Sequence, residues 1–379
     1  MTRFFALLFA VSLLAGCSSF FDIFEDKDQI AELPQFQAGV AVQASWKAQA
    51  GSGGQQVFVP ALAEGAVYLA AADGELGKYD LSTGRNLWRI RTKQPLSGGV
   101  GAGSNLVLMG SIKGGVFAYD SQGKPLWQAR VPSEVLSPPQ VADGVVVVRS
   151  NDGSVSGLDA ASGARKWIYQ RPTPALTIRA HAGAVLSGGV AYVGFAGGRL
   201  AAIELANGNV LWEVSVAQPR GATELERVTD ITSLPVVDGR QVCAVAYQGR
   251  LACFQASNGD LLWAREVSSI AGMADDGDNL YVVDSKGAVL AYDKRSGASV
   301  WKQDKLATRG LGTPVVYGKY VVMGDYQGYV HFLAREDGAL VGRFDTDGSA
   351  LPTVPLPADD RLLVQTRGGS VYALELKQS

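Results

Sequence analysis

The sequence has few of the residue types on which most enzymes and metal sites depend. Its 379 residues include two His and three Cys, and 34 Lys and Arg nearly balance 36 Asp and Glu, giving a net charge of −2. His181 falls in a predicted connection and His331 in a predicted strand, and no further His can complete a metal-binding pair. No basic block, Gly-x-Ser-x-Gly elbow or Walker loop stands out. The sequence therefore predicts no nucleic-acid partner, no catalytic residue, no metal and no cofactor.

A hydrophobic run long enough to span a bilayer is also missing. The apolar segment at residues 4–14 is too short, and with Arg3 before it and small residues after it, it is typical of a secretory signal. The following "LAGC" resembles the lipobox of bacterial lipoproteins, which implies cleavage before Cys17 and acylation of that Cys. A plain signal peptide with an incidental Cys is the alternative.

Acylation of Cys17 would hold the protein firmly on a membrane surface without spanning it. By the same resemblance, Ser18 after the Cys implies an outer-membrane anchor with the body of the protein facing the periplasm. We therefore expect a signal peptide at residues 1–16, a lipidated linker at residues 17–38, and one folded domain at residues 39–379. The linker sequence up to residue 36 would span at most about 70 Å when extended.

What the chain does contain is a repeat, marked by regularly spaced Trp. The spacings between successive Trp are 42, 39, 40, 45, 51 and 38 residues, and Phe344 continues the series 43 residues after the last. Each aromatic after the first ends a similar phrase, such as "DGELGKYDLSTGRNLW" or "KGAVLAYDKRSGASVW". The seven Trp are Trp46, Trp88, Trp127, Trp167, Trp212, Trp263 and Trp301.

Each repeat predicts four short antiparallel strands. In residues 236–263, for example, Asp-Gly, Gln-Gly and Asn-Gly pairs separate apolar stretches and supply the turns. Four antiparallel strands at a period near 40 residues indicate a blade of a β-propeller. We expect the aromatic residue of each outer strand to pack between neighbouring blades.

The two ends of the repeat series complement each other. Trp46 has no third strand before it, whereas the final "GGSVYALEL" has no aromatic strand after it. Because an open ring would leave strand edges unpaired, we predict an all-β, eight-bladed propeller of four-stranded blades, closed by pairing of N- and C-terminal strands. An open solenoid of seven and a half units is the alternative.

Cys243 and Cys253 remain after removal of the signal and flank one predicted hairpin turn. A cross-strand disulfide is one interpretation, and the periplasm would permit it. We favour the other, in which both residues are buried free thiols that act as small hydrophobes.

The two longest spacings point to a binding surface. Their extra residues follow Trp167 and Trp212, in consecutive interblade connections that should emerge on the same face of the propeller. The first connection presents Leu176, Ile178 and Arg179 downstream of two Pro, a combination that suits a protein interface. Coverage of the blade edge by the two aliphatic residues, with Arg179 solvated or paired, is the alternative. The second connection contains a possible helical turn at residues 223–227, followed by Asp230.

The repeat phrase "AYDKRSGASVW" resembles that of quinoprotein-type propellers, some of which bind pyrroloquinoline quinone. A pyrroloquinoline-quinone-dependent periplasmic dehydrogenase is therefore the alternative function. Those enzymes are typically larger and often carry a vicinal Cys pair that this chain lacks. The recurring Asp80, Asp120, Asp159 and Asp293 suit turns better than an acid cluster.

A lipobox, a short linker and eight such blades together resemble the BamB family of the outer-membrane β-barrel assembly complex. The resemblance implies a non-enzymatic scaffold that contacts POTRA domains of the barrel-assembly protein BamA and other assembly lipoproteins indirectly. Unfolded outer-membrane proteins are further candidate partners. Leu176, Ile178 and Arg179 match the family's Leu-x-Leu-Arg patch and Asp230 matches its first acidic position, whereas Thr232 stands where a second acid is expected.

Overall fold

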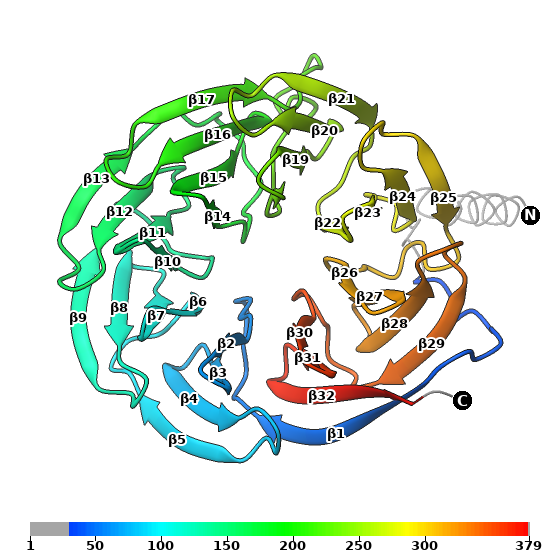
Figure 1. Ribbon diagram of the computed structural model, residues 1–379, viewed down its shortest axis with the longest axis horizontal. Coiled ribbons are helices and arrows are strands. Elements are labelled where there is room, and N and C mark those ends of the chain that lie inside the picture. Colours follow the sequence, from blue (N-terminus) through cyan, green and yellow to red (C-terminus); the bar gives the residue numbers. More distant parts are fainter. Residues whose placement is uncertain (1–29, 378–379) are drawn as a thin grey trace, which may run out of the picture.

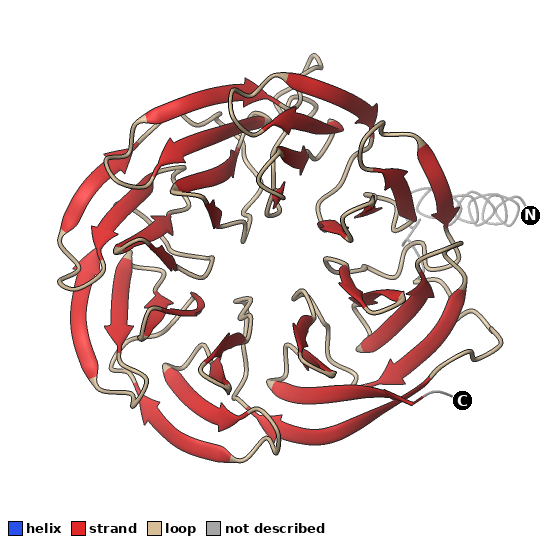
Figure 2. Cartoon of the chain, in the orientation of Figure 1, coloured by secondary structure: helices blue, strands red, loops and turns tan. Residues whose placement is uncertain are grey.

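The protein is a closed ring of eight four-stranded antiparallel sheets in the computed structural model, which describes residues 30–377. Viewed down the ring axis, the sheets surround a central opening, and the described part consists of strands and loops (Figures 1 and 2). The predicted eight-bladed propeller is confirmed. Cys17 and the predicted signal peptide lie outside the described residues.

We number the blades in chain order, and each runs from an inner strand at the opening to an outer strand at the rim. Blades 1 to 4 comprise β2 (Ala61–Ala63), β3 (Ala66–Ala70), β4 (Glu75–Asp80) and β5 (Asn86–Arg91); β6 (Gly98–Gly103), β7 (Leu106–Gly110), β8 (Gly115–Tyr119) and β9 (Pro125–Arg130); β10 (Gln140–Ala142), β11 (Val145–Arg149), β12 (Val155–Asp159) and β13 (Arg165–Tyr169); and β14 (Ala184–Ser187), β15 (Val190–Phe195), β16 (Arg199–Glu204) and β17 (Val210–Ser215).

Blades 5 to 8 comprise β18 (Val236–Val237), β19 (Gln241–Val245), β20 (Arg250–Gln255) and β21 (Leu261–Glu266); β22 (Gly272–Asp275), β23 (Asn279–Val283), β24 (Val289–Asp293) and β25 (Ser299–Gln303); β26 (Val315–Tyr317), β27 (Tyr320–Gly324), β28 (Tyr329–Ala334) and β29 (Leu340–Asp345); and β30 (Leu356–Ala358), β31 (Arg361–Gln365), β32 (Ser370–Lys377) and β1 (Ala41–Gln49).

The two ends of the chain close the ring in blade 8. Strand β1 is the outer strand of this blade and pairs antiparallel with β32, from Ala41 opposite Lys377 to Gln49 opposite Ser370. Figure 1 shows the blue and red strands side by side at the rim. The predicted closure is confirmed, and the open solenoid is wrong.

The Trp repeat joins each blade to the next. The indole Nε1 of Trp46 donates a hydrogen bond of 2.9 Å to the Leu81 carbonyl in the following blade, and the other six Trp make equivalent bonds. Gly84 meets the Trp46 ring so closely that a Cβ there would lie 2.5 Å from it, and its φ of +67° also favours glycine. Phe344 has no N–H to donate and instead packs edge-on against Tyr372 at 5.6 Å.

The recurring Asp residues cap the hairpin turns, as expected. The Asp80 carboxylate accepts hydrogen bonds from the hydroxyl groups of Ser82 and Thr83 at 2.6 and 2.7 Å, and these bonds lower its pKa to about 2. Asp159 and Asp293 make the same contact with Ser162 and Ser296. Stabilisation of the charged carboxylate by local donors explains why Asp recurs at this position.

The preference for free thiols at Cys243 and Cys253 is wrong, because the two residues form a disulfide. They lie directly opposite each other on β19 and β20, and both are fully buried. Their equal parity across the hairpin, which the sequence did indicate, places both sulfurs on one face of the sheet. The bond therefore joins neighbouring strands inside blade 5.

The described part of the predicted linker lies against blade 7. Arg309 donates from Nη1 to the Ala31 carbonyl, and Arg343 donates from Nη2 to the Pro34 carbonyl at 2.9 Å. The Arg343 guanidinium also lies 5.0 Å from the centre of the Phe36 ring, which packs on the apolar core between blades 6 and 7. We call residues 31–38 the strap, because these contacts fix them to the propeller.

Beneath the strap is a buried polar cluster. Arg309 and Asp325 form an ion pair at 2.7 Å with almost no exposure, and His331 Nε2 lies 2.9 Å from the same carboxylate. Burial lowers the pKa of His331, which keeps the imidazole neutral near pH 7. Burial would raise the pKa of Asp325, but its hydrogen bonds to His331, Tyr329 and Arg309 outweigh that effect and lower it.

The ring has two different faces. All outer strands run in the same direction along the axis, so every connection from an outer strand to the next inner strand lies on one face, which we call the loop face. Strand β1 starts on the opposite face, beside Val341, where Gly39 N donates to the Val341 carbonyl at 2.8 Å. The strap therefore carries the chain along blade 7 from the loop face, at Ala31, to the opposite face.

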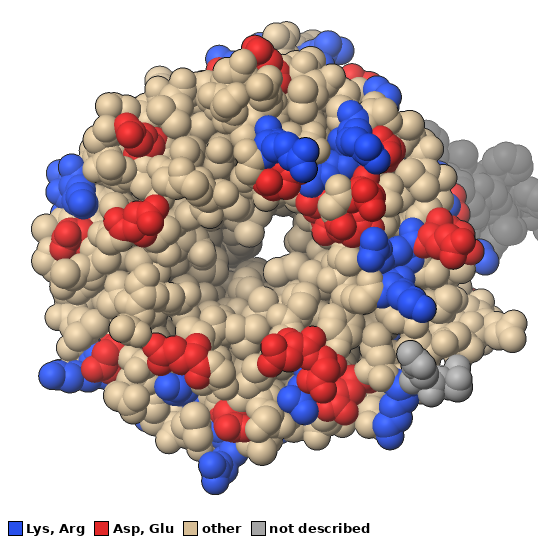
Figure 3. All heavy atoms as spheres, viewed as in Figure 1, with Lys and Arg blue, Asp and Glu red and all other residues tan. Residues whose placement is uncertain are grey.

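A channel with a volume of about 1430 Å³ passes through the ring. Figure 3 shows its opening, with Lys, Arg, Asp and Glu side chains gathered mainly on the right of the view, over blades 5 to 7. Both signs lie next to each other on this face.

Candidate docking surface

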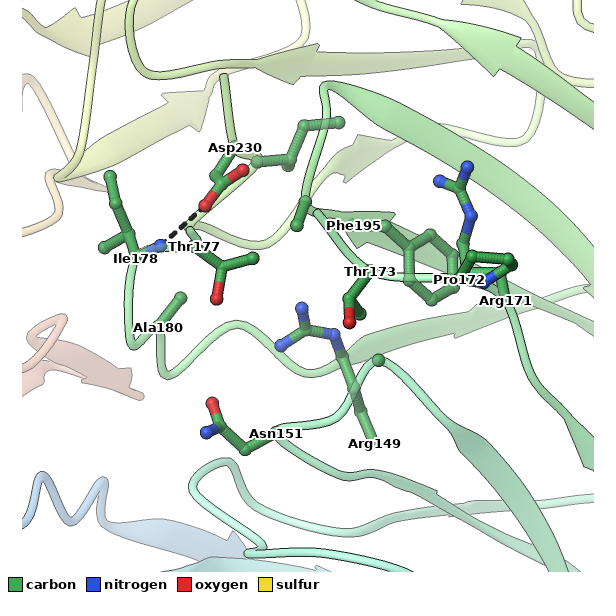
Figure 4. Close-up of a pocket in the computed structure, with 13 residues that line it drawn as sticks. Arg149, Asn151, Arg171, Pro172, Thr173, Thr177, Ile178, Ala180, Phe195 and Asp230 are labelled. Carbon is green, nitrogen blue, oxygen red and sulfur yellow. Dashed lines mark hydrogen bonds between the residues drawn. The ribbon is translucent and has the colours of Figure 1, made fainter. Parts of the chain in front are cut away.

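The two enlarged connections predicted from the Trp spacing meet on the loop face. They link β13 to β14 and β17 to β18, and one carboxylate joins them. Asp230 of the second connection accepts a hydrogen bond from Ile178 N at 2.6 Å (Figure 4) and another from Gly197 N at 3.0 Å. The expectation that these connections lie together on one face is confirmed.

Leu176 and Arg179 present their side chains on the outside of the first connection. Leu176 is 47% exposed. The Arg179 guanidinium donates to the Glu134 carboxylate at 3.1 and 3.3 Å, yet its side chain stays 45% exposed. Ile178 is partly buried, since its backbone is held by Asp230.

Asp230 is buried, whereas a residue that contacts a partner would be exposed. Its exposure is 3%, and both carboxylate oxygens are engaged with backbone N–H groups. Sequence reasoning grouped it with Leu176, Ile178 and Arg179 as a surface residue. The structure brings all four together, but Asp230 sits beneath the first connection and fixes its path.

The rest of the second connection is held by local hydrogen bonds. Thr223 and Glu226 cap a single turn, in which the Glu226 carboxylate accepts from Thr223 N at 3.1 Å and Glu226 N donates to the Thr223 hydroxyl at 3.2 Å. Thr232, which replaces the expected second acid, is buried and donates from Oγ1 to the Ile270 carbonyl at 2.9 Å. Thr232 thus ties this connection to the next one around the ring.

The mouth of the channel adjoins these connections. Ile178 and Arg179 line it, and so do the exposed side chains of Leu234, Ile270 and Tyr326. The predicted surface therefore continues into an apolar rim around the channel.

Sequence reasoning missed Arg149, which lies under the first connection. It ends β11 and lines a small pocket together with Thr173, Thr177, Phe195 and Asp230 (Figure 4). The signal was present in the sequence, because "VVVVRS" places a single cation at the end of an otherwise apolar strand. Residue spacing alone indicates no partner for Arg149.

Within residues 30–377, no group of three or more His, Cys, Asp and Glu side chains lies where it could hold a metal ion. His181 lies near the channel mouth, and burial lowers the pKa of its imidazole. The same residues contain no helix long and apolar enough to cross a membrane.

Comparison with known sequences gives one consistent family. A family model described as "Outer membrane protein assembly factor BamB" matches residues 72–303 and 286–378. A protein of that name from Nitrosomonas eutropha is 45% identical over 385 residues, covering 98% of this chain and 94% of its own length. The Escherichia coli protein of the same name is 34% identical, with 97% of each chain covered.

Solved structures agree with the sequence comparison. BamB from Moraxella catarrhalis superposes with a TM-score of 0.82 at 27% identity, covering 88% of this chain and all of that one. A quinohemoprotein alcohol dehydrogenase from Comamonas testosteroni gives a TM-score of 0.70 at 13% identity, covering 88% of this chain and 76% of its own. The second likeness shows a shared propeller fold alone.

Proposed function

Because this chain belongs to the BamB family of outer membrane protein assembly factors, we propose that it is a non-enzymatic scaffold of the β-barrel assembly machinery. Its loop face would dock on periplasmic POTRA domains of the barrel-assembly protein BamA and so assist delivery or insertion of outer-membrane proteins. The observation that carries this proposal is the junction of the two enlarged connections, where Asp230 fixes a loop that exposes Leu176 and Arg179.

This junction has the properties of a preformed interface. Leu176 offers apolar area and Arg179 a planar cation, and the fixed loop backbone lowers the entropy lost on binding. The Arg179–Glu134 pair is half exposed, so it costs little to rearrange when a partner arrives. In this proposal Asp230 is a positioning residue, which acts by holding Ile178 rather than by contacting the partner.

A lipid anchor at Cys17 would complement this surface. The strap brings the chain to the loop face at Ala31, the first such contact in the described part of the chain, and 13 residues, 18–30, separate Ala31 from the predicted anchor. These residues span at most about 45 Å, against about 70 Å for an unattached linker. An anchor on this tether would hold the loop face near the membrane, and the shared surface raises the effective concentration of a membrane-bound partner.

The proposal predicts that Leu176→Ala combined with Arg179→Glu weakens binding to the POTRA domains by at least about tenfold. Loss of a central apolar contact and reversal of a charge each remove binding energy at the same place. The measurement is a pull-down of purified POTRA domains with the folded variant, followed by titration to obtain Kd.

A matched control is Leu126→Ala with Arg130→Glu on the outer strand of blade 2. Leu126 is 47% exposed, as Leu176 is, and Arg130 is also exposed, so the two double variants change surface composition equally. The control should bind as the wild type does. Equal binding by the wild type and the Leu176 and Arg179 variant would show that the partner docks elsewhere.

A further inference from the structure

Arg149 has an unusual position for a cation that is not neutralised. Its Nη1 donates to the Ala182 carbonyl at 2.9 Å, and its guanidinium lies 6.0 Å from the centre of the buried Phe195 ring. Its Nε is buried and has no hydrogen-bond partner among residues 30–377. A guanidinium can donate five hydrogen bonds, and the structure records one for Arg149.

The neighbouring carboxylates are engaged elsewhere. Asp230 accepts from Ile178 N and Gly197 N, and Asp152 accepts from the Ser150 hydroxyl at 2.8 Å. Among the described residues, no carboxylate forms an ion pair with Arg149. Burial lowers the pKa of its guanidinium to about 10, although the charges of Asp230 and Asp152 oppose that shift. Arg149 is therefore charged at neutral pH.

Arg171, the second arginine beside the Phe195 ring, differs from Arg149 because it has an anionic partner. Arg171 lies 5.7 Å from the centre of the Phe195 ring, but it pairs with Glu213 at 3.6 Å. Only Arg149 of the two therefore lacks an anionic partner within the described chain. It lies at the pocket seen in Figure 4, between the turn at Asn151 and the exposed Thr173 and Thr177.

We propose that this pocket receives a carboxylate oxygen from an acidic side chain of the protein that docks on the loop face. The inference rests on the proposed function and adds the chemistry of the contact. The pocket has a volume of about 20 Å³, which is room for a water-sized group. A carboxylate oxygen fits that space.

The pocket's position favours an acid on a docked protein over a free anion. Its edge is formed by Thr177 and Ile178 of the connection that exposes Leu176 and Arg179. A partner seated on those residues would cover the pocket and exclude water, which strengthens an ion pair to guanidinium. A free anion would have to bind in competition with water at an open site.

The decisive variant is Arg149→Met, which keeps an unbranched apolar stem and removes the charge. Deleting an unpaired, partly buried charge should leave the melting temperature unchanged or raise it. The same change should raise the Kd for the POTRA domains by at least about tenfold, since the partner's acid would then be buried without a counter-charge. Arg149→Lys should recover part of the affinity, because it restores the charge without the planar donor array.

The control is Arg130→Met, which removes an exposed cation from blade 2 and should change neither quantity. In one series of binding titrations, acetate at up to 100 mM should replace chloride, so that a free carboxylate competes with the partner for the pocket. Weak or no competition is expected, and full competition would mean that the site prefers a free anion and would overturn the proposal.

The outcomes separate this inference from the proposed function. If Arg149→Met binds as the wild type does while the Leu176 and Arg179 variant loses binding, the docking surface stands and the pocket proposal is wrong. If neither variant loses binding, the docking surface itself is wrong. If Arg149→Met lowers the melting temperature, Arg149 has a structural role and the proposal is also overturned.

Discussion

Deletion of residues 370–379 is expected to unfold the whole propeller rather than trim its end. The deletion removes β32, which pairs with both β1 and β31 and fully buries Val371, Ala373 and Leu374. Burial of a Val or Leu side chain contributes about 1.5–3 kcal/mol, and a domain is stable by only about 5–15 kcal/mol. Loss of the strand and its two ladders is therefore comparable with the entire stability of the ring.

The effect should reach distant blades because every blade depends on the ring being closed in blade 8. Without β32, β1 loses its partner and the edges of blades 7 and 1 lose their neighbour. The circular dichroism spectrum of the deletion variant at 25 °C should be that of an unfolded chain, and heating it should show no cooperative unfolding transition. Removal of only residues 378–379 is the control, since it leaves β32 intact, and it should melt as the full chain does. A ten-residue deletion that keeps the native melting temperature would contradict closure by the terminal strands.

The second large effect is expected for Asp325→Asn in blade 7. Asp325 is fully buried between Arg309 and His331, and Asn keeps its size while removing its charge. Arg309 would then be a buried cation without a counter-charge, which costs about 3–5 kcal/mol in the free energy of unfolding. Because Arg309 also holds the Ala31 carbonyl, the strap should become more accessible to protease in the same variant.

Asp304→Asn is the matched control for Asp325→Asn. Asp304 pairs with Lys302 at 3.3 Å, but both side chains are more than half exposed, so this pair contributes about 0–1 kcal/mol. Denaturant titration should give a lower midpoint for Asp325→Asn and a nearly unchanged one for Asp304→Asn. Equal midpoints for the two variants would mean that the buried pair does not hold blade 7 together.

The eight-bladed architecture could be predicted because each repeat contains the residues that join its blade to the next one. The Trp that ends each phrase needs a carbonyl and a ring-sized gap in the next blade, and the Gly of the next phrase provides that gap, as Gly84 does for Trp46. A regular pattern of this kind also makes its interruption informative, which is how closure by the terminal strands could be inferred.

Two features of the fold could not be predicted, for different reasons. The Cys243–Cys253 disulfide needed the strand register, since sequence parity allowed both a bond and two thiols. The strap could not be recognised, because its contacts with Arg309 and Arg343 join residues about 300 positions apart. The composition of residues 31–38 is as typical of an unattached linker as of a segment fixed to the propeller.

The candidate site was predictable in its place but not in its internal arrangement. Long connections after Trp167 and Trp212 located it, because insertions in a regular repeat must leave the sheet. The direction of a side chain in an irregular loop has no periodicity, so the burial of Asp230 could not be foreseen. The pocket at Arg149 depends on four separate segments that meet only in the fold, residues 149–153, 171–180, 195–196 and 230–231.

The most direct test of docking through the loop face is site-specific photo-cross-linking in living cells. A cross-linking amino acid would replace Leu176 on the loop face or Leu262 on the outer rim, residues with similar exposure of 47% and 49%. The proposal predicts a cross-link to the barrel-assembly protein from position 176 and none from position 262. A cross-link from position 262 alone, or equal cross-links from both, would contradict it.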